Sequence, residues 1–243
     1  MLIPSTILVL LVWSGLPSAA QAQPSDECVI LFHGLARSSS SMKPIARRLE
    51  AEGYQVVNVD YPSRDFTVQA LAGAHVPQGI ASCRATDATR IHFVTHSLGG
   101  ILVRHYLKDH PVPDLGRVVM LAPPNQGSEV VDDWKEAPGY AWLNGPAGQQ
   151  LGTDAQSVPL QLGPVTYPVG IIAGTRTVNP LLSQSLPNPD DGKVSVARTK
   201  VRGMTDHIEV PHSHTFIMRS ATVQDQILHF LQHEAFAREP ADA

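Results

Sequence analysis

Short apolar runs recur along the chain, and longer segments with apolar side chains at helical spacing lie between them. The runs typical of buried strands are residues 29–32, 55–59, 91–95, 117–121, 169–173 and 208–210. This alternation predicts an α/β fold, with a doubly wound, mostly parallel sheet that carries helices on both faces. In such a sheet the carboxyl ends of the strands form the edge at which ligands bind.

Two helices can be placed from the spacing of their apolar positions. Residues 41–52 show apolar side chains at helical spacing, and Gly53 follows as a stop. Residues 222–238 form a second such segment, whose apolar face includes Ile227 and Phe230. We therefore expect a helix after the first strand and a terminal helix that ends the fold.

Residues 124–167 depart from the alternation. They are rich in Gly and Pro, include Trp134, Tyr140 and Trp142, and show no strand signal. Long irregular segments beside a ligand site often cover it, so we expect a cap or lid insertion rather than a second domain. A surface excursion without a role is the alternative. A chain of 243 residues suits one α/β domain, which we place over residues 23–243.

The N-terminus has the composition of a targeting segment. Residues 1–22 contain no charged side chain, and residues 7–13 are apolar without interruption. Ala20-Gln21-Ala22 fits the small-x-small rule for cleavage after Ala22. We expect a cleaved signal peptide and an exported protein, periplasmic or secreted. An uncleaved anchor is the alternative, although the apolar stretch is short for a membrane span.

The chain has two cysteines, Cys28 and Cys83. Cys28 starts the first strand, and Cys83 lies near the end of the helical stretch that leads to the strand at 91–95. Both positions fall at the edge of the sheet opposite the carboxyl ends of the strands. In an exported protein this placement permits one disulfide, and two buried free thiols are the alternative.

The overall charge is slightly acidic, with 18 Lys and Arg against 22 Asp and Glu, a net charge of −4 and a pI near 6.2. Arg47-Arg48 is the longest basic cluster, which argues against a nucleic-acid partner. His212 and His214 have the spacing of a metal pair, but a His-x-His alone is a weak metal signal. We expect no metal ion and no other cofactor.

Residues 95–100 read Thr-His-Ser-Leu-Gly-Gly and directly follow a strand-like run. A strand, a sharp turn at a serine and then a helix form a nucleophile elbow, which lifts the serine hydroxyl clear of the backbone. Ser97 is therefore the candidate nucleophile, and the amide of Leu98 would donate to the oxyanion formed by its attack. Small residues are needed two places before and after the serine. Gly99 fits this requirement, while Thr95 departs from the usual glycine.

Further motifs follow other strands. The first strand ends in His33-Gly34-Leu35, Leu121-Ala122-Pro123 precedes Gly127-Ser128, and Asp191-Gly192 and His214 come later in the chain. With the elbow, these motifs resemble the α/β-hydrolase superfamily, and within it the secreted bacterial lipases and esterases, over about residues 27–233. The resemblance implies that the amide of Leu35 is the second oxyanion donor. It also implies that the catalytic serine, acid and histidine follow one another in that order.

A catalytic base is expected in the loop between the last strand and the terminal helix. His214 is our choice there, and His212 is the alternative. The acid must lie between residue 173 and His214, where the Asp-Gly turn resembles the acid turn of lipases. This selects Asp191, with Asp190 as the alternative, and leaves Asp206 as a structural residue at the start of the last strand.

These residues predict an exported serine hydrolase that cleaves carboxylic esters through a Ser97–Asp191–His214 triad and an acyl-enzyme. The apolar pocket rim and the aromatic insertion favour acyl lipids as substrates and transient contact with lipid surfaces. A thioesterase or acyltransferase on the same fold is one alternative. A binding protein that keeps the fold without catalysis is the other.

Overall fold

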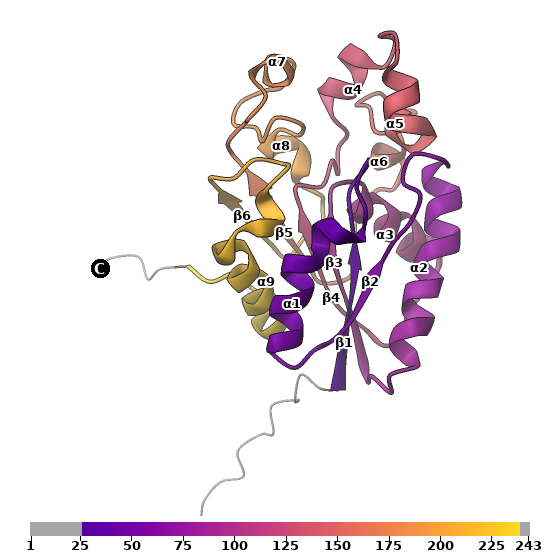
Figure 1. Cartoon of the computed structure of the whole chain (residues 1–243), viewed down its shortest axis with the longest axis vertical. Helices are drawn as coiled ribbons and strands as arrows, with labels where there is room; N and C mark the ends of the chain where they lie inside the picture. Colours follow the sequence, from indigo (N-terminus) through magenta and orange to yellow (C-terminus); the bar gives the residue numbers. More distant parts are fainter. Residues whose placement is uncertain (1–25, 239–243) are drawn as a thin grey trace, which may run out of the picture.

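Six parallel strands form one sheet at the centre of the molecule (Figure 1), in a computed structural model that describes residues 26–238. The strands are β1 (Glu27–Phe32), β2 (Gln55–Val59), β3 (Arg90–His96), β4 (Leu115–Leu121), β5 (Val169–Gly174) and β6 (Asp206–Val210). Their order is β2-β1-β3-β4-β5-β6, and every neighbouring pair runs parallel. Each predicted strand is present and differs at its ends by two residues at most. The signal peptide predicted for residues 1–22 lies outside the described residues.

Helices cover both faces of the sheet, as the alternation predicted (Figure 1). Helices α2 (Val68–Arg84) and α3 (Leu98–Asp109) pack on one face, and α1 (Lys43–Ala51) and α9 (Ala221–His233) pack on the other. Successive side chains of a strand point to opposite faces, so on β1 Ile30 belongs to the first core and Leu31 to the second. All six residues of β1 are buried, which is typical of a central parallel strand.

The helix expected over residues 41–52 starts as a 3₁₀ turn, η2 (Ser39–Met42), and continues as α1. The terminal helix is shorter than predicted, because α9 ends at His233 and Glu234 adopts a left-handed conformation with φ of 59°. The reason is the burial of Phe236, whose ring packs 5.0 Å from that of Phe230. A helix continued to residue 238 would carry Phe236 away from this contact. A second 3₁₀ turn, η3 (Ile217–Arg219), precedes α9.

Short helices lie above the carboxyl ends of the strands (Figure 1). Between β4 and β5 these are α4 (Glu129–Trp134), α5 (Tyr140–Gln149) and α6 (Val158–Gln161), and between β5 and β6 they are α7 (Pro180–Ser183) and α8 (Val196–Thr199). The segment that we expect to form a cap is therefore helical. Helix α5 kinks at Gly145, whose φ is 64° and whose Cα has no room for a Cβ against the backbone of Arg64. This glycine lets the segment dock on the loop after β2.

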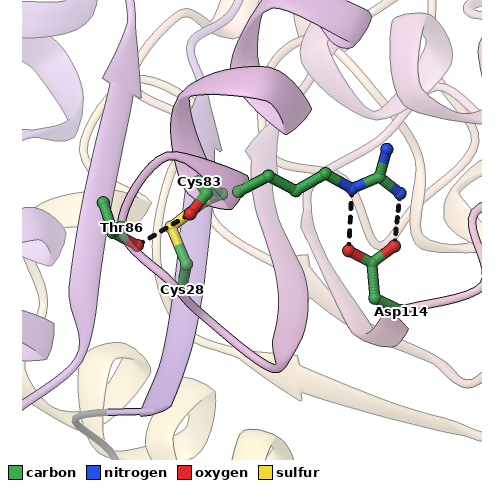
Figure 2. Close-up of a disulfide and its surroundings, with 5 residues drawn as sticks. Cys28, Cys83, Thr86 and Asp114 are labelled. Atoms are coloured by element: carbon green, nitrogen blue, oxygen red, sulfur yellow. Dashed lines mark hydrogen bonds and ion pairs between the residues drawn. A yellow bond between two sulfur atoms is a disulfide. The ribbon is translucent and has the colours of Figure 1, made fainter.

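A disulfide joins Cys28 at the start of β1 to Cys83 in the last turn of α2 (Figure 2). The two Cα atoms lie 5.7 Å apart, and the Thr86 hydroxyl donates to the carbonyl of Cys83 over 2.7 Å. Arg84, which follows Cys83 in the chain, pairs with Asp114 just before β4, with an Nε–Oδ2 distance of 2.9 Å. The end of α2 is thus tied to the amino edge of the sheet, where the sequence placed both cysteines.

Beside the disulfide lies a buried polar pair, Glu27 and His92, with an Oε2–Nε2 distance of 3.2 Å. The amide of Arg117 donates to Nδ1 of His92 over 2.9 Å, so Nε2 carries the ring proton and faces the carboxylate. Burial alone would raise the pKa of Glu27. The hydrogen bond from His92 and the positive charges of Arg90 and Arg117 outweigh it and lower that pKa. Within residues 26–238, no helix is both long and apolar enough to cross a membrane.

Replacing both cysteines by alanine should lower the free energy of unfolding by about 4 kcal/mol, from the loss of a cross-link between residues 55 apart. Urea denaturation under non-reducing conditions measures this loss. Wild type treated with reductant is the control, since it loses the cross-link and keeps both side chains. Equal stability of the oxidised and reduced wild type would contradict the prediction.

The Glu27→Gln variant should be less stable than wild type by about 1–2 kcal/mol at neutral pH, because it loses a charged, buried hydrogen-bond acceptor. The folded pKa of Glu27 lies below its ordinary value of 4.5, so this stabilisation is complete above pH 4.5. It should disappear as the pH falls through the folded pKa. Denaturation curves between pH 3 and pH 7 measure the difference, with the exposed Glu50→Gln as the control. A difference that stays constant over this range would rule the mechanism out.

Candidate active site

The site lies where the strand order reverses, between the carboxyl ends of β1 and β3. Ser97 directly follows β3 and precedes α3, with φ of 53° and ψ of −120°. A positive φ is strained for a side chain other than glycine, and the nucleophile elbow is one of the few turns that keeps it. The Ser97 amide donates to the carbonyl of Leu121 over 2.9 Å, which fixes the turn against β4.

Glycines let the elbow approach the loop after β1. A Cβ on Gly99 would lie 2.6 Å from the carbonyl oxygen of Phe32, and one on Gly34 would lie 2.6 Å from Nδ1 of His96. Both distances are too short for any larger residue. Thr95, which departs from the usual glycine, lies beside Gly100. A Cβ at Gly100 would lie only 3.2 Å from the Thr95 hydroxyl, so Gly100 makes room for the threonine.

Asp191 and His214 are in direct contact. Oδ2 of Asp191 lies 2.8 Å from Nδ1 of His214, and both side chains are buried. Oδ1 of Asp191 accepts hydrogen bonds from the amides of Lys193 and Val194 over 3.0 and 2.8 Å. The His214 amide also donates to the carbonyl of Asp191 over 3.0 Å. This pairing keeps the proton on Nδ1 and leaves Nε2 as an acceptor, the form that a general base needs.

The alternative residues have other partners. Oδ1 of Asp190 accepts from the amide of Gly192 over 2.7 Å, and its Oδ2 accepts from the Ser183 hydroxyl over 2.6 Å. Asp190 therefore shapes the turn, while Asp191 contacts the histidine. Asp206 pairs with Arg238 at the start of β6, in the structural role expected for it. His212 does not line the cavity that holds His214.

The loop after β1 is braced by His33, as a structural rather than a catalytic residue. Its buried ring stacks on Tyr61 with a centroid distance of 4.0 Å, and its Nε2 accepts from the Tyr61 amide. Burial lowers the pKa of His33, which favours this neutral form. Ala36 has a φ of 55°, and its amide donates to the Ser63 hydroxyl over 3.0 Å. The residues between them, Gly34 and Leu35, are held from both sides.

The amides of Leu35 and Leu98 both have no acceptor among the hydrogen bonds of the described residues. Leu98 is the first residue of α3, where helix amides have no partner within the helix. Both amides belong to the two segments that the glycines bring together around Ser97. Two free donors at this place are what an oxyanion would need.

His96 is a residue of the site that the sequence reasoning missed. It is fully buried, and its Nε2 lies 3.0 Å from the carbonyl oxygen of His214. Burial, followed by the charge of His214, lowers the pKa of His96 well below its usual range. A neutral His96 donates from Nε2 and holds the backbone of the residue expected to be the base. Its place between Thr95 and Ser97 was the only signal, in a chain with eleven histidines.

A cavity of about 250 Å³ opens beside Ser97 and His214. Most of its apolar lining comes from the segment between β4 and β5, with Pro124, Val130, Val131, Trp134, Tyr140, Leu143 and Leu151. Leu35, Leu182 and Val194 complete it. The Ser128 hydroxyl caps α4 by accepting from the Val130 amide, and it donates to the carbonyl of Lys193 over 2.6 Å. The segment between β4 and β5 is therefore joined to the loop that carries Asp191. Within residues 26–238, no group of three or more metal-binding side chains comes together.

Comparisons with known proteins agree with this fold. The sequence model of the alpha/beta hydrolase family matches residues 29–240. Among solved structures, the mature lipase BlEst2 from Bacillus licheniformis is 19% identical, with a TM-score of 0.71 over 90% of this chain and 96% of that one. Phospholipase PlaB from Legionella pneumophila is 19% identical, with a TM-score of 0.70 over 86% of this chain and 59% of its own. The metagenomic carboxyl esterase MGS0156 is 18% identical, with a TM-score of 0.63 over 84% of this chain and 69% of that one. A search of curated protein sequences finds no match.

Replacing Gly99 by alanine should destabilise the protein by about 1–3 kcal/mol, because its Cβ would meet the backbone of β1, which cannot move aside. Gly73→Ala is the matched control. Gly73 lies on the exposed side of α2, where an added Cβ would meet no atom within 4 Å, so alanine should stabilise the helix by about 0.5–1 kcal/mol. Thermal unfolding measures both, and a stable Gly99→Ala would show that the close approach is not needed.

Proposed function

The chain belongs to the alpha/beta hydrolase family, and from that premise we propose that it is an exported serine hydrolase that cleaves carboxylic esters. The observation that carries the proposal is the Asp191–His214 hydrogen bond of 2.8 Å, formed beside the cavity that the strained Ser97 also lines. A serine hydroxyl is a poor nucleophile unless a base takes its proton and a third group orients that base. Asp191 and His214 fit these two roles.

The reaction proceeds in two steps. His214 takes the Ser97 proton as the oxygen attacks the ester carbonyl, and the amides of Leu35 and Leu98 stabilise the oxyanion. His214 then gives the proton to the leaving alcohol, and an acyl-enzyme remains. Water, deprotonated by the same histidine, attacks the acyl-enzyme and releases the carboxylic acid. Asp191 stays ionised throughout, with its charge held by backbone amides and the imidazole.

Acyl lipids are the substrate class that the cavity favours. Its wall of aliphatic and aromatic side chains suits an acyl chain, since burial of apolar surface is favourable. Trp142 and Leu143 of α5 and Leu181 of α7 are 83%, 52% and 58% exposed, although they are large and apolar. All three lie on the helices above the carboxyl edge of the sheet (Figure 1). Such exposed apolar residues support transient contact with a lipid surface. BlEst2 is a lipase and PlaB a phospholipase, which agrees with this substrate class.

We also propose that the segment between β4 and β5 acts as a cap, since it forms most of the apolar wall. Export is supported by the signal-like composition of residues 1–22 and by the disulfide, because disulfides persist in oxidising compartments. The protein would then act in the periplasm or outside the cell.

The proposed triad predicts a specific order of losses. Ser97→Ala should reduce turnover of a p-nitrophenyl ester by at least about a thousandfold, because no other group can form the acyl-enzyme. Asp191→Asn should cost about as much, since it removes the charge that orients His214, while Asp190→Asn should change turnover less than about tenfold. Steady-state kinetics of the three variants, each checked for folding by circular dichroism, measure this order. Equal losses for both Asp variants would overturn the choice of Asp191.

A chain-length series of p-nitrophenyl esters separates the remaining candidates. Serine-dependent turnover supports ester hydrolysis, and its length profile distinguishes a short-acyl esterase from a lipase. Turnover of acyl thioesters alone, or transfer to an added alcohol in place of water, would favour a thioesterase or an acyltransferase. A folded protein that does not react with a serine-directed phosphonate would be a binding protein.

A further inference from the structure

Two cations line the cavity beside Ser97, and no carboxylate does. They are Arg37, in the loop after β1, and Lys193, in the turn that carries Asp191. The whole chain has four more acidic than basic side chains, so a lining that holds only positive charge is contrary to its composition. Charge of one sign gathered at a cavity raises the local concentration of ligands of the opposite sign.

Neither cation is neutralised by the protein. Within residues 26–238, Arg37 and Lys193 form no ion pair, although Arg48, Arg84, Arg198 and Arg238 all do. The charge of Asp191 acts on Lys193, but the two oxygens of Asp191 already accept from His214 and from backbone amides. The positive charge at the cavity is therefore available to a ligand.

The two cations also act on each other. Desolvation by the surrounding protein lowers the pKa of Lys193, and the positive charge of Arg37 lowers it further. Both charges act in the same direction on His96, which lies against His214. An anion bound beside both cations would be attracted by each of them.

Lys193 lies in the turn beside the Asp191–His214 pair, which would protonate the leaving group. Lys193 is two residues from Asp191, and its backbone contacts that carboxylate, so it belongs to the wall formed around His214. Half of the apolar lining residues come from α4 and α5 instead. An ester bound with its acyl chain on the apolar wall would direct its alcohol toward His214, which protonates the leaving oxygen, and toward the cations.

We propose that Arg37 and Lys193 select esters whose alcohol part carries an anionic group, a phosphate or a carboxylate. This inference rests on the proposed function and adds the class of alcohol that the site prefers. The guanidinium of Arg37 can bind either anion through two parallel hydrogen bonds, and the Lys193 ammonium adds a third donor. Neutral esters of the same acyl chain would bind without these contacts.

The test compares esters that differ only in this charge. One pair is monooctanoylglycerol and its phosphate, and the other is the octanoyl esters of para-hydroxybenzamide and para-hydroxybenzoate, all below their aggregation concentrations. Wild type should hydrolyse the anionic member of at least one pair with a kcat/KM about fivefold or more above the neutral member. The pair that shows the larger ratio identifies phosphate or carboxylate as the preferred anion. Added salt should lower the ratio.

In the double variant Arg37→Gln/Lys193→Gln the ratio should fall to about one. The matched control is Arg47→Gln/Lys200→Gln, which removes the same charge from exposed positions outside the cavity lining and should keep the wild-type ratio. A wild-type ratio near one for both pairs, or an unchanged ratio in the cavity variant, would overturn the proposal. So would an equal loss for the neutral and anionic esters, because it would mean that the cations act on the oxyanion or on the fold.

Failure of the proposed function gives a different result. In that case wild type hydrolyses none of the four esters, and Ser97→Ala changes nothing. Isothermal titration calorimetry then measures binding of the same four esters to two proteins. One is Ser97→Ala, and the other is the triple variant Ser97→Ala/Arg37→Gln/Lys193→Gln. Tighter, salt-sensitive binding of the anionic members that depends on Arg37 and Lys193 would support the selection of anions, and equal binding of all four would overturn it.

Discussion

The site depends on one close approach, between the loop that leaves β1 and the start of α3. Gly99 meets the carbonyl of Phe32 and Gly34 meets the ring of His96 at distances that leave no space for a Cβ. This contact brings the free amides of Leu35 and Leu98 to the two sides of the strained serine turn. A methyl group added at Gly34 or Gly99 would push the two segments apart. It would separate the two amide donors even if the Asp191–His214 pair stayed intact. Backbone packing, more than the identity of any one reactive side chain, therefore sets the geometry.

His214, the proposed base, is held by segments that come from different parts of the sheet. His96 from the end of β3 contacts the carbonyl of His214, and the turn after β5 supplies Asp191. Ser128, at the start of the segment between β4 and β5, hydrogen-bonds the same turn through Lys193. The hydrogen bonds between these segments join three connections into one arrangement, because each buried polar group satisfies another.

The sequence predicted the features that depend on local patterns. Buried parallel strands are continuous apolar runs, and Ser97 lies in a turn whose residues are adjacent in the chain. The features it did not predict arise from contacts between distant segments. His96 gains its role from a carbonyl 118 residues away, and the Ser63 hydroxyl supports Ala36 across 27 positions. The end of α9 was also misplaced, because the contact of Phe236 with the core outweighs a helical pattern that continues beyond it.

The way Asp191 is neutralised explains why the cavity can hold free positive charge. A buried carboxylate must find donors, and a neighbouring ammonium would be one solution. Here the donors are the imidazole of His214 and the backbone amides of Lys193 and Val194, so the Lys193 side chain is not needed for that purpose. Lys193 and Arg37 therefore line the cavity without an ion pair among the described residues. The same turn can thus orient the base through its backbone and contact the alcohol part of a substrate through its side chain.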